Sequence, residues 1–359
     1  MSDKKFTVIM PLYNHDLYVG DAIKSVLSQK YENFELVICN DGSTDNSLEV
    51  AKSFDDDRII IIDKPNGGCV SALNACILQS TGDYICWLSS DDYFGVEKLN
   101  YHLFAHKNSS ARISIAPSAE FRGANFTNIK YNIEGGVSRM LPFLGRNPIN
   151  GLAICAHRSM YLEYGLFDTR YKFSHDYERW LSFLKYEEPV YVDGAPQSFT
   201  RLGTSFVKDS NPFFNGDLDN FRVVARRLHE GIQYFIPKEY EMNDSALQYM
   251  LKFFLSMSDP GSNYFFRFGF SDFYIKSICR FIVKFNMEAA LREINDSDFC
   301  HKNIAVNSMV KRCNNYIALN DLKVDPLEFI MHLRFLVSSD ILSFENKKCV
   351  EYYIENSLP

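Results

Sequence analysis

Two adjacent acidic residues could do metal chemistry at the end of a predicted strand. Asp91 and Asp92 follow the apolar run 83–87, after a short link that contains Ser89 and Ser90. The run predicts a buried strand, so the two carboxylates should lie at the carboxyl edge of a sheet, where open α/β sheets bind ligands. Adjacent carboxylates are costly there unless a cation or hydrogen-bond donors compensate them. The pair therefore predicts a metal-diphosphate site, with an Asp-rich turn or helix N-cap as the structural alternative.

A second acid, Asp41, follows the apolar run 34–39 in the same way. We expect its carboxylate at the sheet edge, where it can accept hydrogen bonds from the N–H of a nucleobase or from ribose hydroxyls. Gly42 permits a tight turn behind it, and Thr44 or Asp45 is expected to cap the following helix. Capping is also the structural alternative for Asp41 itself, and local chemistry weighs the two roles equally.

A glycine pair, Gly67 and Gly68, follows Asn66 and precedes a predicted helix that contains Asn74. Paired glycines let the backbone approach a ligand closely, and the N-terminus of a helix favours anions. A diphosphate fits such a site, although glycine pairs are also common in ordinary loops.

The first predicted strand ends without a phosphate-binding glycine loop. Residues 11–14 match neither the GxGxxG pattern of dinucleotide-binding proteins nor the GxxxxGK[ST] phosphate loop, which argues against hydride transfer, NTP hydrolysis and nucleotidyl transfer. Pro11 has no N–H to donate to a ladder, so the strand is predicted to stop there and to turn into the ligand crevice.

Short β-branched runs alternate with amphipathic stretches in the first third of the chain, which is the pattern of βαβ units and a parallel sheet. The runs are continuously apolar, as expected for strands covered on both faces. The predicted strands are residues 6–10, 34–39, 58–62 and 83–91, and the predicted helices are residues 17–29, 47–54 and 68–79. We therefore expect an α/β domain over residues 1–210.

Strand signals fade after residue 210, and residues 211–359 are predicted to form a mainly helical module, with helical stretches at 221–235 and 289–294. The stretch 265–285 carries basic residues among aromatic ones and leaves two interpretations open, a helix on an anionic membrane surface and a core helix. The module has three candidate partners: the acceptor, the membrane in a peripheral contact, and a second copy of the chain in a homo-oligomer.

Composition restricts the class of protein. With 359 residues, 46% of them hydrophobic and 23% charged, the chain is typical of a packed globular protein rather than a disordered one. A net charge of -7 disfavours broad binding of nucleic acids. The first residues lead straight into a strand without an apolar signal, so we expect a cytoplasmic protein, either free or at the inner face of the membrane. The nine cysteines lack CxxC spacing and predict reduced core thiols.

Taken in order, segments 8–14, 40–45, 66–68 and 88–92 resemble the family 2 glycosyltransferases, which have the GT-A fold, and the resemblance covers residues 6–205. It implies a nucleotide-sugar donor bound across the strand ends. The implied donor-binding residues are Pro11, Tyr13 and Asp41 around the base, Asn66, Gly68 and Asn74 along the nucleoside and diphosphate, and Asn14, Ser89 and Ser90 as further contacts, the serines near the ribose.

The family's DxD motif binds ribose through its first Asp and a divalent metal through its second. These positions correspond here to Ser89 and Asp91, so the first acid is missing. The resemblance implies Asp91 as a metal ligand with Asp92 assisting it, and Mn²⁺ or Mg²⁺ as the cofactor.

Residues 174–180 resemble the acceptor-side segment of the family, which carries the catalytic carboxylate. Asp176 is the best candidate for the base, with Glu178 and His175 as alternatives, because His175 stands where the family has an acid. The structural alternative is a solvated helix face with Trp180 packed inward.

Trp180 and Arg201 are assigned to the acceptor and phosphate side, with a structural Arg on the rim of the domain as the alternative for Arg201. Together the assignments imply an inverting glycosyltransferase, with a UDP-sugar as the default donor. The implied acceptor is a glycan or a lipid-linked molecule in surface polysaccharide biosynthesis. A catalytically silent nucleotide-sugar-binding or scaffold protein is the rival hypothesis, because Ser89 and His175 replace acids.

Overall fold

The chain forms two compact units, residues 1–135 with 147–211 and residues 136–146 with 212–359. The computed structural model describes residues 4–129, 131, 136, 139–144, 147–171, 173–202, 223–224, 226–227, 231–257, 271–302 and 304–322. Segment 136–146 thus belongs to the second unit although it lies within the first in sequence, which a single boundary at residue 210 does not anticipate.

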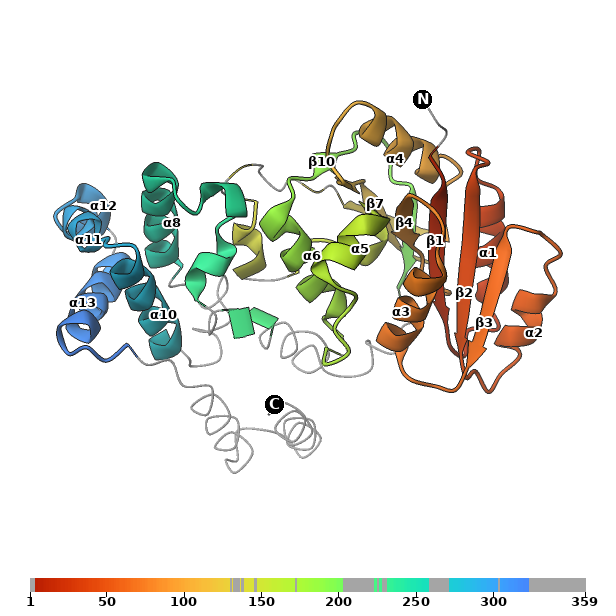
Figure 1. Ribbon diagram of the computed structural model, residues 1–359, viewed down its shortest axis with the longest axis horizontal. Coiled ribbons are helices and arrows are strands. Elements are labelled where there is room, and N and C mark those ends of the chain that lie inside the picture. The colour runs from red at the N-terminus through yellow and green to blue at the C-terminus, as the bar shows by residue number, and fades with distance from the viewer. Residues whose placement is uncertain are drawn as a thin grey trace. The chain divides into compact units, whose positions relative to one another are not determined.

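A seven-stranded sheet is the centre of the first unit (Figure 1). Its strands, in spatial order, are β10 (Val190–Tyr191), β6 (Ile113–Ile115), β9 (Ile154–His157), β4 (Tyr84–Trp87), β1 (Phe6–Leu12), β2 (Phe34–Asp41) and β3 (Ile59–Lys64). The four strands from β4 to β3 are parallel, and β9 runs antiparallel to both of its neighbours. The prediction of an α/β fold with a mostly parallel sheet is confirmed.

Helices cover the sheet, as the continuously apolar strands predict. Every residue of β1 and β2 is therefore buried. The helices of this unit are α1 (Val19–Leu27), α2 (Ser47–Lys52), α3 (Cys69–Gln79), α4 (Lys98–Lys107), α5 (Arg158–Tyr164) and α6 (His175–Tyr186), with the short 3-10 helix η3 (Gly151–Ala153). The apolar side of α1 packs with β1 and β2 in the main core, and α3 also packs against both strands.

The prediction that Pro11 ends the first strand is wrong. β1 continues to Leu12, and Pro11 lies opposite Cys39 of β2. β4 pairs with β1 only as far as Ile9, whose carbonyl accepts from the N–H of Leu88. Backbone groups two residues apart point to the same side of a strand, so the nitrogen of Pro11 points to the same side as the carbonyl of Ile9. At Pro11 this side of β1 is no longer paired with β4. Proline costs no ladder hydrogen bond there.

A second sheet of four strands, not predicted from the sequence, completes the unit. Its order is β5 (Tyr93–Phe94), β11 (Ser198–Arg201), β7 (Ser118–Arg122) and β8 (Asn125–Ile129). One face carries an aromatic row in which Tyr93 stacks on Phe199 and Phe121 stacks on Phe126.

All described elements of the second unit are helical, as predicted. They are η2 (Leu141–Leu144), η5 (Ile232–Phe235), η6 (Lys238–Tyr240), α8 (Asp244–Ser256), α10 (Ser271–Lys284), α11 (Glu288–Asn295), α12 (Asp298–Lys302) and α13 (Ile304–Ala318). Within the predicted stretch 265–285, α10 buries Ile275, Ile278 and Phe281, which supports the core interpretation, and residues 265–270 lie outside the described residues. Among the helices that the structure describes, none has the length and apolar character needed to cross a bilayer.

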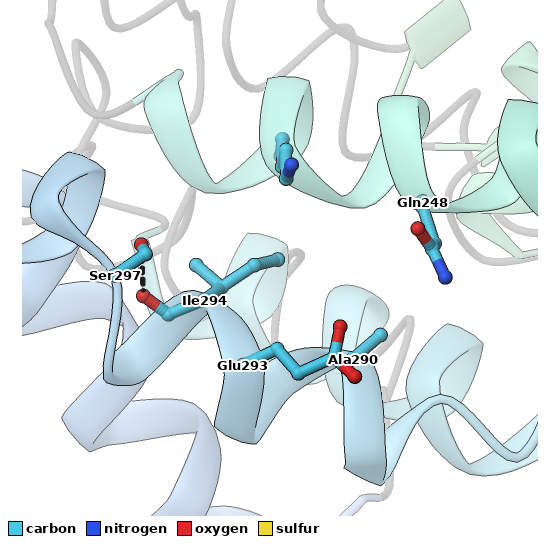
Figure 2. Close-up of a pocket in the computed structure, with 6 residues that line it drawn as sticks. Gln248, Ala290, Glu293, Ile294 and Ser297 are labelled. Carbon is cyan, nitrogen blue, oxygen red and sulfur yellow. Dashed lines mark hydrogen bonds between the residues drawn. The ribbon is translucent and has the colours of Figure 1, made fainter.

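Figure 2 shows a pocket between α8 and α11 of the second unit. It is lined by Gln248, Lys252, Ala290, Glu293, Ile294 and Ser297. Its volume of about 70 Å³ is well below the roughly 300–1,000 Å³ of small-molecule sites, so it is too small for a nucleotide sugar.

Candidate active site

The four parallel strands end at one edge of the main sheet, and the predicted donor-side residues lie at or just after these ends. Asp41 is the last residue of β2, and its side chain is almost completely buried. Its carboxylate forms an ion pair with Lys64, the last residue of β3, and accepts a hydrogen bond of 2.9 Å from the N–H of Gly67. Asp41 therefore joins the end of β2 to the loop after β3.

Gly42 is required by this junction. Its φ of +68° is in the left-handed region, and a Cβ atom would come within 2.7 Å of the nitrogen of Asn66. The loop after β3 can approach β2 this closely only because residue 42 has no side chain.

Asn14 connects the loop after β1 to the loop after β2. It adopts a φ of +52°, its N–H donates to Ser43 Oγ at 3.1 Å, and its side-chain oxygen accepts from the N–H of Thr44 at 2.8 Å. Asp45 accepts from the first N–H of α2, on Ser47, at 2.9 Å, although the N-cap position of the helix is Asn46 and not the predicted Thr44 or Asp45. Tyr13 is half-buried beside Asn14, and Pro11 lies within β1.

Gly68 precedes α3 with a φ of +86°, and open space surrounds the position that its Cβ would take. Asn66 is exposed in the same loop. Asn74 has a different environment, because its amide donates to the carbonyl of Phe167 at 2.9 Å and accepts from the N–H of Phe167 at 3.0 Å. Asn74 thus ties α3 to the segment that leads into α6, and these contacts do not support a direct role in holding diphosphate.

In the turn after β4, Ser90, Asp91 and Asp92 are buried, and Ser89 is half-buried. Ser90 Oγ lies 2.7 Å from His15 Nδ1, and Asp92 Oδ1 accepts from the backbone N–H of Arg201 at 2.6 Å. Ser90 and Asp92 are therefore anchored to other segments of the same unit.

The acceptor-side candidates lie in the first turn of α6, where their environments differ. Asp176 is partly exposed, and its Oδ2 accepts from Asn147 Nδ2 at 2.9 Å. Glu178 is only 3% exposed and pairs with Arg179 at 2.9 Å, so its carboxylate is held inside the protein. His175 is buried and packs near the ring of Trp87. Of the three candidates, only Asp176 combines a carboxylate with access to solvent.

Trp180 belongs to the core. Its side chain is 1% exposed and packs edge-on against Phe167 and close to Phe183. The burial contradicts a direct contact between Trp180 and an acceptor, and it agrees with the structural alternative of an inward-packed indole.

Cys69, the first residue of α3, is influenced by the charges of three of the predicted acids. Burial among protein atoms and then the negative charges of Asp41, Asp176 and Asp91 raise the pKa of the Cys69 thiol to about 12. Cys69 is nevertheless exposed to solvent. Acids from the end of β2, the turn after β4 and the start of α6 therefore contribute to the negative potential at the first residue of α3.

Sequence reasoning missed several residues of this site. Lys64 ends the segment that precedes the glycine pair, and Cys69 follows that pair directly, so both could have been found from the motif. Asn147 and Gly151 carry no such signal. A side chain at Gly151 would overlap the ring of Trp87, so the absence of a Cβ lets the indole lie against the backbone.

Among the residues that the structure describes, no group of three or more His, Cys, Asp and Glu side chains is placed to hold a metal ion. Mg²⁺ and Mn²⁺ sites in nucleotide-dependent enzymes commonly use one or two carboxylates, with substrate phosphates and water as the other ligands. The carboxylate of Asp91, together with other oxygen atoms of the turn after β4, fits a ligand set of that kind.

Comparisons with known proteins agree with the fold. The family model described as Glycosyl transferase family 2 matches residues 7–162. An uncharacterized glycosyltransferase of Rickettsia typhi is 32% identical over 195 residues, which are 52% of this chain and 60% of the relative. Glycosyltransferase GlyA of Streptococcus pneumoniae is 41% identical over 93 residues, 25% of this chain and 13% of the relative. The chain thus spans 60% or less of the length of these curated relatives.

Solved structures extend the similarity beyond the matched segment. The structure of S. aureus TarS 1–349 in complex with UDP has a TM-score of 0.54 and 15% sequence identity, and the match covers 88% of this chain and 90% of TarS. The same TarS segment with UDP-GlcNAc gives a TM-score of 0.54 at 16% identity, with coverage of 77% and 81%. The fold is GT-A, and residues 7–162 form a Glycosyl transferase family 2 domain.

Proposed function

We propose that this protein is an inverting, metal-dependent glycosyltransferase that moves a sugar from a nucleotide-sugar donor to a hydroxyl group of a glycan or lipid-linked acceptor. The observation that carries the proposal is that Asp41 ends β2, Asp91 lies in the turn after β4 and Asp176 lies in the first turn of α6, in a family 2 domain. A UDP-sugar is the donor to test first, because TarS has been solved with UDP and with UDP-GlcNAc. Surface polysaccharide biosynthesis is the proposed setting.

On the donor side, Asp41 is proposed to accept hydrogen bonds from the nucleoside. Its ion pair with Lys64 and its contact with the N–H of Gly67 hold the carboxylate in place. The backbone at Gly68 and the N-terminus of α3 face the diphosphate, whose negative charge the helix end stabilises. Asp91 would hold Mn²⁺ or Mg²⁺, which when bound offsets the charge that develops on the departing diphosphate.

On the acceptor side, Asp176 is proposed to take the proton of the attacking hydroxyl group. The hydrogen bond from Asn147 orients its carboxylate. One displacement at the anomeric carbon inverts its configuration. Glu178 is a weaker candidate because Arg179 holds it in the interior, and His175 is the remaining alternative if Asp176 proves dispensable.

Calorimetric titration of the purified protein with UDP, GDP and dTDP, each with and without Mn²⁺, tests the proposal. We expect one nucleotide, UDP first, to bind more tightly when Mn²⁺ is present. Asp176→Asn should keep that binding and lose sugar transfer, as measured by release of nucleoside diphosphate from the matching sugar nucleotide. Full transfer by Asp176→Asn would move the base to His175 or Glu178.

A catalytically silent nucleotide-sugar-binding protein is the second candidate, because Ser89 and His175 occupy positions where the family has acids. It predicts nucleotide binding without turnover for every sugar nucleotide and acceptor. If the wild-type protein releases nucleoside diphosphate and Asp176→Asn does not, the protein is an enzyme and not a silent binding protein.

A further inference from the structure

Arg201, at the end of β11, contacts several segments around the acidic turn. Its Nε donates to the carbonyl oxygen of Asp91 at 3.1 Å, and its backbone N–H donates to Asp92 Oδ1 at 2.6 Å. Its guanidinium lies 5.0 Å from the ring centre of Tyr18 and 5.0 Å from that of Phe121. One residue therefore connects the loop before α1, the turn after β4 and the small sheet.

Neither hydrogen bond uses the carboxylate of Asp91. One fixes the peptide group that follows the Asp91 side chain, and the other fixes the neighbouring side chain. The two bonds hold the carbonyl of Asp91 and the side chain of Asp92, so they fix the stretch of backbone from which the Asp91 side chain projects. A guanidinium between two aromatic rings has few alternative rotamers, which makes it a rigid support.

We propose that Arg201 and Asp92 are positioning residues that orient Asp91 for the divalent cation. The inference rests on the proposed function and deepens it. It assigns the two adjacent acids different tasks: Asp91 would hold the divalent cation, which would offset the charge of the nucleoside diphosphate, and Asp92 anchors the turn to β11. Arg201 acts through the turn and not on the phosphates.

The proposal predicts an effect on the gain in UDP affinity that Mn²⁺ produces, and not on UDP binding in general. A misplaced Asp91 weakens the binding of Mn²⁺ together with UDP but leaves the metal-free affinity for UDP unchanged, because Asp41 and the N-terminus of α3 are untouched. A residue that contacts the diphosphate itself would change both affinities. The ratio of UDP affinities with and without Mn²⁺ therefore separates the two roles.

The experiment is calorimetry of UDP binding with and without Mn²⁺ on the wild-type protein and four variants. Asp91→Asn should abolish the gain in UDP affinity that Mn²⁺ produces. Arg201→Ala and Asp92→Ala should each reduce that gain about tenfold and keep the metal-free affinity within twofold. Tyr18→Leu, which removes one of the rings but no hydrogen bond of Arg201, should reduce it by a smaller factor and serves if Arg201→Ala fails to fold.

Arg58→Ala is the matched control. Arg58 also donates from Nε to an aspartate, Asp56 at 2.9 Å, and also lies over a ring, Phe34 at 4.4 Å, but it precedes β3 at the opposite edge of the sheet. It should leave the Mn²⁺ gain unchanged.

Two results would overturn the inference while the proposed function stands. Equal loss of metal-free and Mn²⁺-dependent UDP affinity in Arg201→Ala would make Arg201 a phosphate ligand. A gain abolished in Asp92→Ala but intact in Arg201→Ala would make Asp92 a direct metal ligand. Absence of UDP binding by the folded wild-type protein would instead overturn the UDP assignment itself, and with it this role of the turn.

Discussion

The acids at the two edges of the main sheet have different electrostatic surroundings. At the amino edge, Glu35 accepts hydrogen bonds from Lys5 Nζ at 2.6 Å, from Thr7 Oγ1 at 2.7 Å, and from both the N–H and the hydroxyl of Thr81 at 2.6 Å. Burial alone would raise the pKa of Glu35, but these donors lower it to about 2. At the carboxyl edge, burial among protein atoms raises the pKa of the Cys69 thiol, and the negative charges of three acids raise it further.

We interpret Glu35 as an acid that stabilises the fold, and the acids of the carboxyl edge as residues that bind a ligand. The amino edge brings a lysine and two threonines to one carboxylate, so its charge is compensated by the chain itself. The carboxyl edge collects negative charges from three elements; Lys64 compensates that of Asp41, and a cation held by Asp91 would offset more of the total. Substitutions that neutralise an acid should therefore have opposite effects at the two edges.

The largest expected effect is the loss of metal-dependent nucleotide binding in Asp91→Asn. We expect UDP affinity in the presence of Mn²⁺ to fall about 100-fold, because the cation loses its charged protein ligand. The melting temperature should stay unchanged or rise, since one of three neighbouring negative charges is removed. Calorimetry and thermal unfolding of the same sample measure both. A large drop in melting temperature would show that Asp91 stabilises the fold as Glu35 does, and the contrast between the edges would be lost.

Glu35→Gln should give the reverse result. The amide cannot accept from all four donors and brings N–H groups towards them, so we expect a loss of about 2–3 kcal/mol in the free energy of unfolding. Binding of UDP with Mn²⁺ should be retained. Urea denaturation gives the first quantity, and Glu32→Gln, an exposed neighbour on the same segment, is the control that should change neither.

Acid should weaken the amino edge over a defined range. The folded pKa of Glu35, about 2, lies below its ordinary value of 4.5, so its contribution to stability is present above pH 4.5 and is lost as the pH falls towards 2. The lowered pKa corresponds to about 3 kcal/mol in total, of which roughly 2 kcal/mol is lost by pH 3. The difference in unfolding free energy between wild type and Glu35→Gln should therefore shrink by that amount from pH 5 to pH 3. A constant difference would mean that Glu35 does not titrate in this range.

The sequence predicts the four parallel strands and the acids that follow them, because continuous apolar runs and strand-end motifs are local signals. It does not predict the small sheet, whose pairing of Tyr93 with Phe199 joins distant segments through two-residue and four-residue strands. The same limit applies to the site. Asp41 and Asp91 are found by their position after a strand, whereas the contact of Asn147 with Asp176 depends on tertiary structure alone.

The error at Pro11 has a similar cause. The rule that proline leaves a central strand is correct for a residue with neighbours on both sides. Whether a neighbour is present depends on the length of β4, which ends at Trp87 and so leaves that side of β1 open beyond Ile9. The length of one strand relative to another is not encoded in either segment by itself.

Gly151→Ala tests whether close packing, as well as charge, shapes the carboxyl edge. The new methyl group would overlap the ring of Trp87 and must displace it, which we expect to cost about 1–3 kcal/mol. Trp87 and Trp180 are the only tryptophans of the chain, so intrinsic fluorescence reports the movement directly. Gly20→Ala in α1 is the control, because its Cβ would meet Val50 at an ordinary 3.6 Å and helix propensity favours alanine. Unchanged emission in Gly151→Ala would mean that the indole is not held against this backbone.

The smallest expected effect is a change in the reactivity of Cys69, which measures the negative potential at the carboxyl edge. Its pKa of about 12 keeps the thiol protonated, so alkylation by iodoacetamide at pH 8 should be slow although the side chain is exposed. Asp91→Asn removes one of the three charges that raise this pKa, and we expect the rate at Cys69, followed by mass spectrometry, to rise two- to fivefold, as for a shift of a fraction of a pKa unit. Asp83→Asn, which neutralises an acid just before β4 at the amino edge, should leave the rate unchanged. Equal rates in wild type and Asp91→Asn would mean that the acids do not share one field around α3, and the carboxyl edge would then be a set of separate carboxylates and not a single charged site.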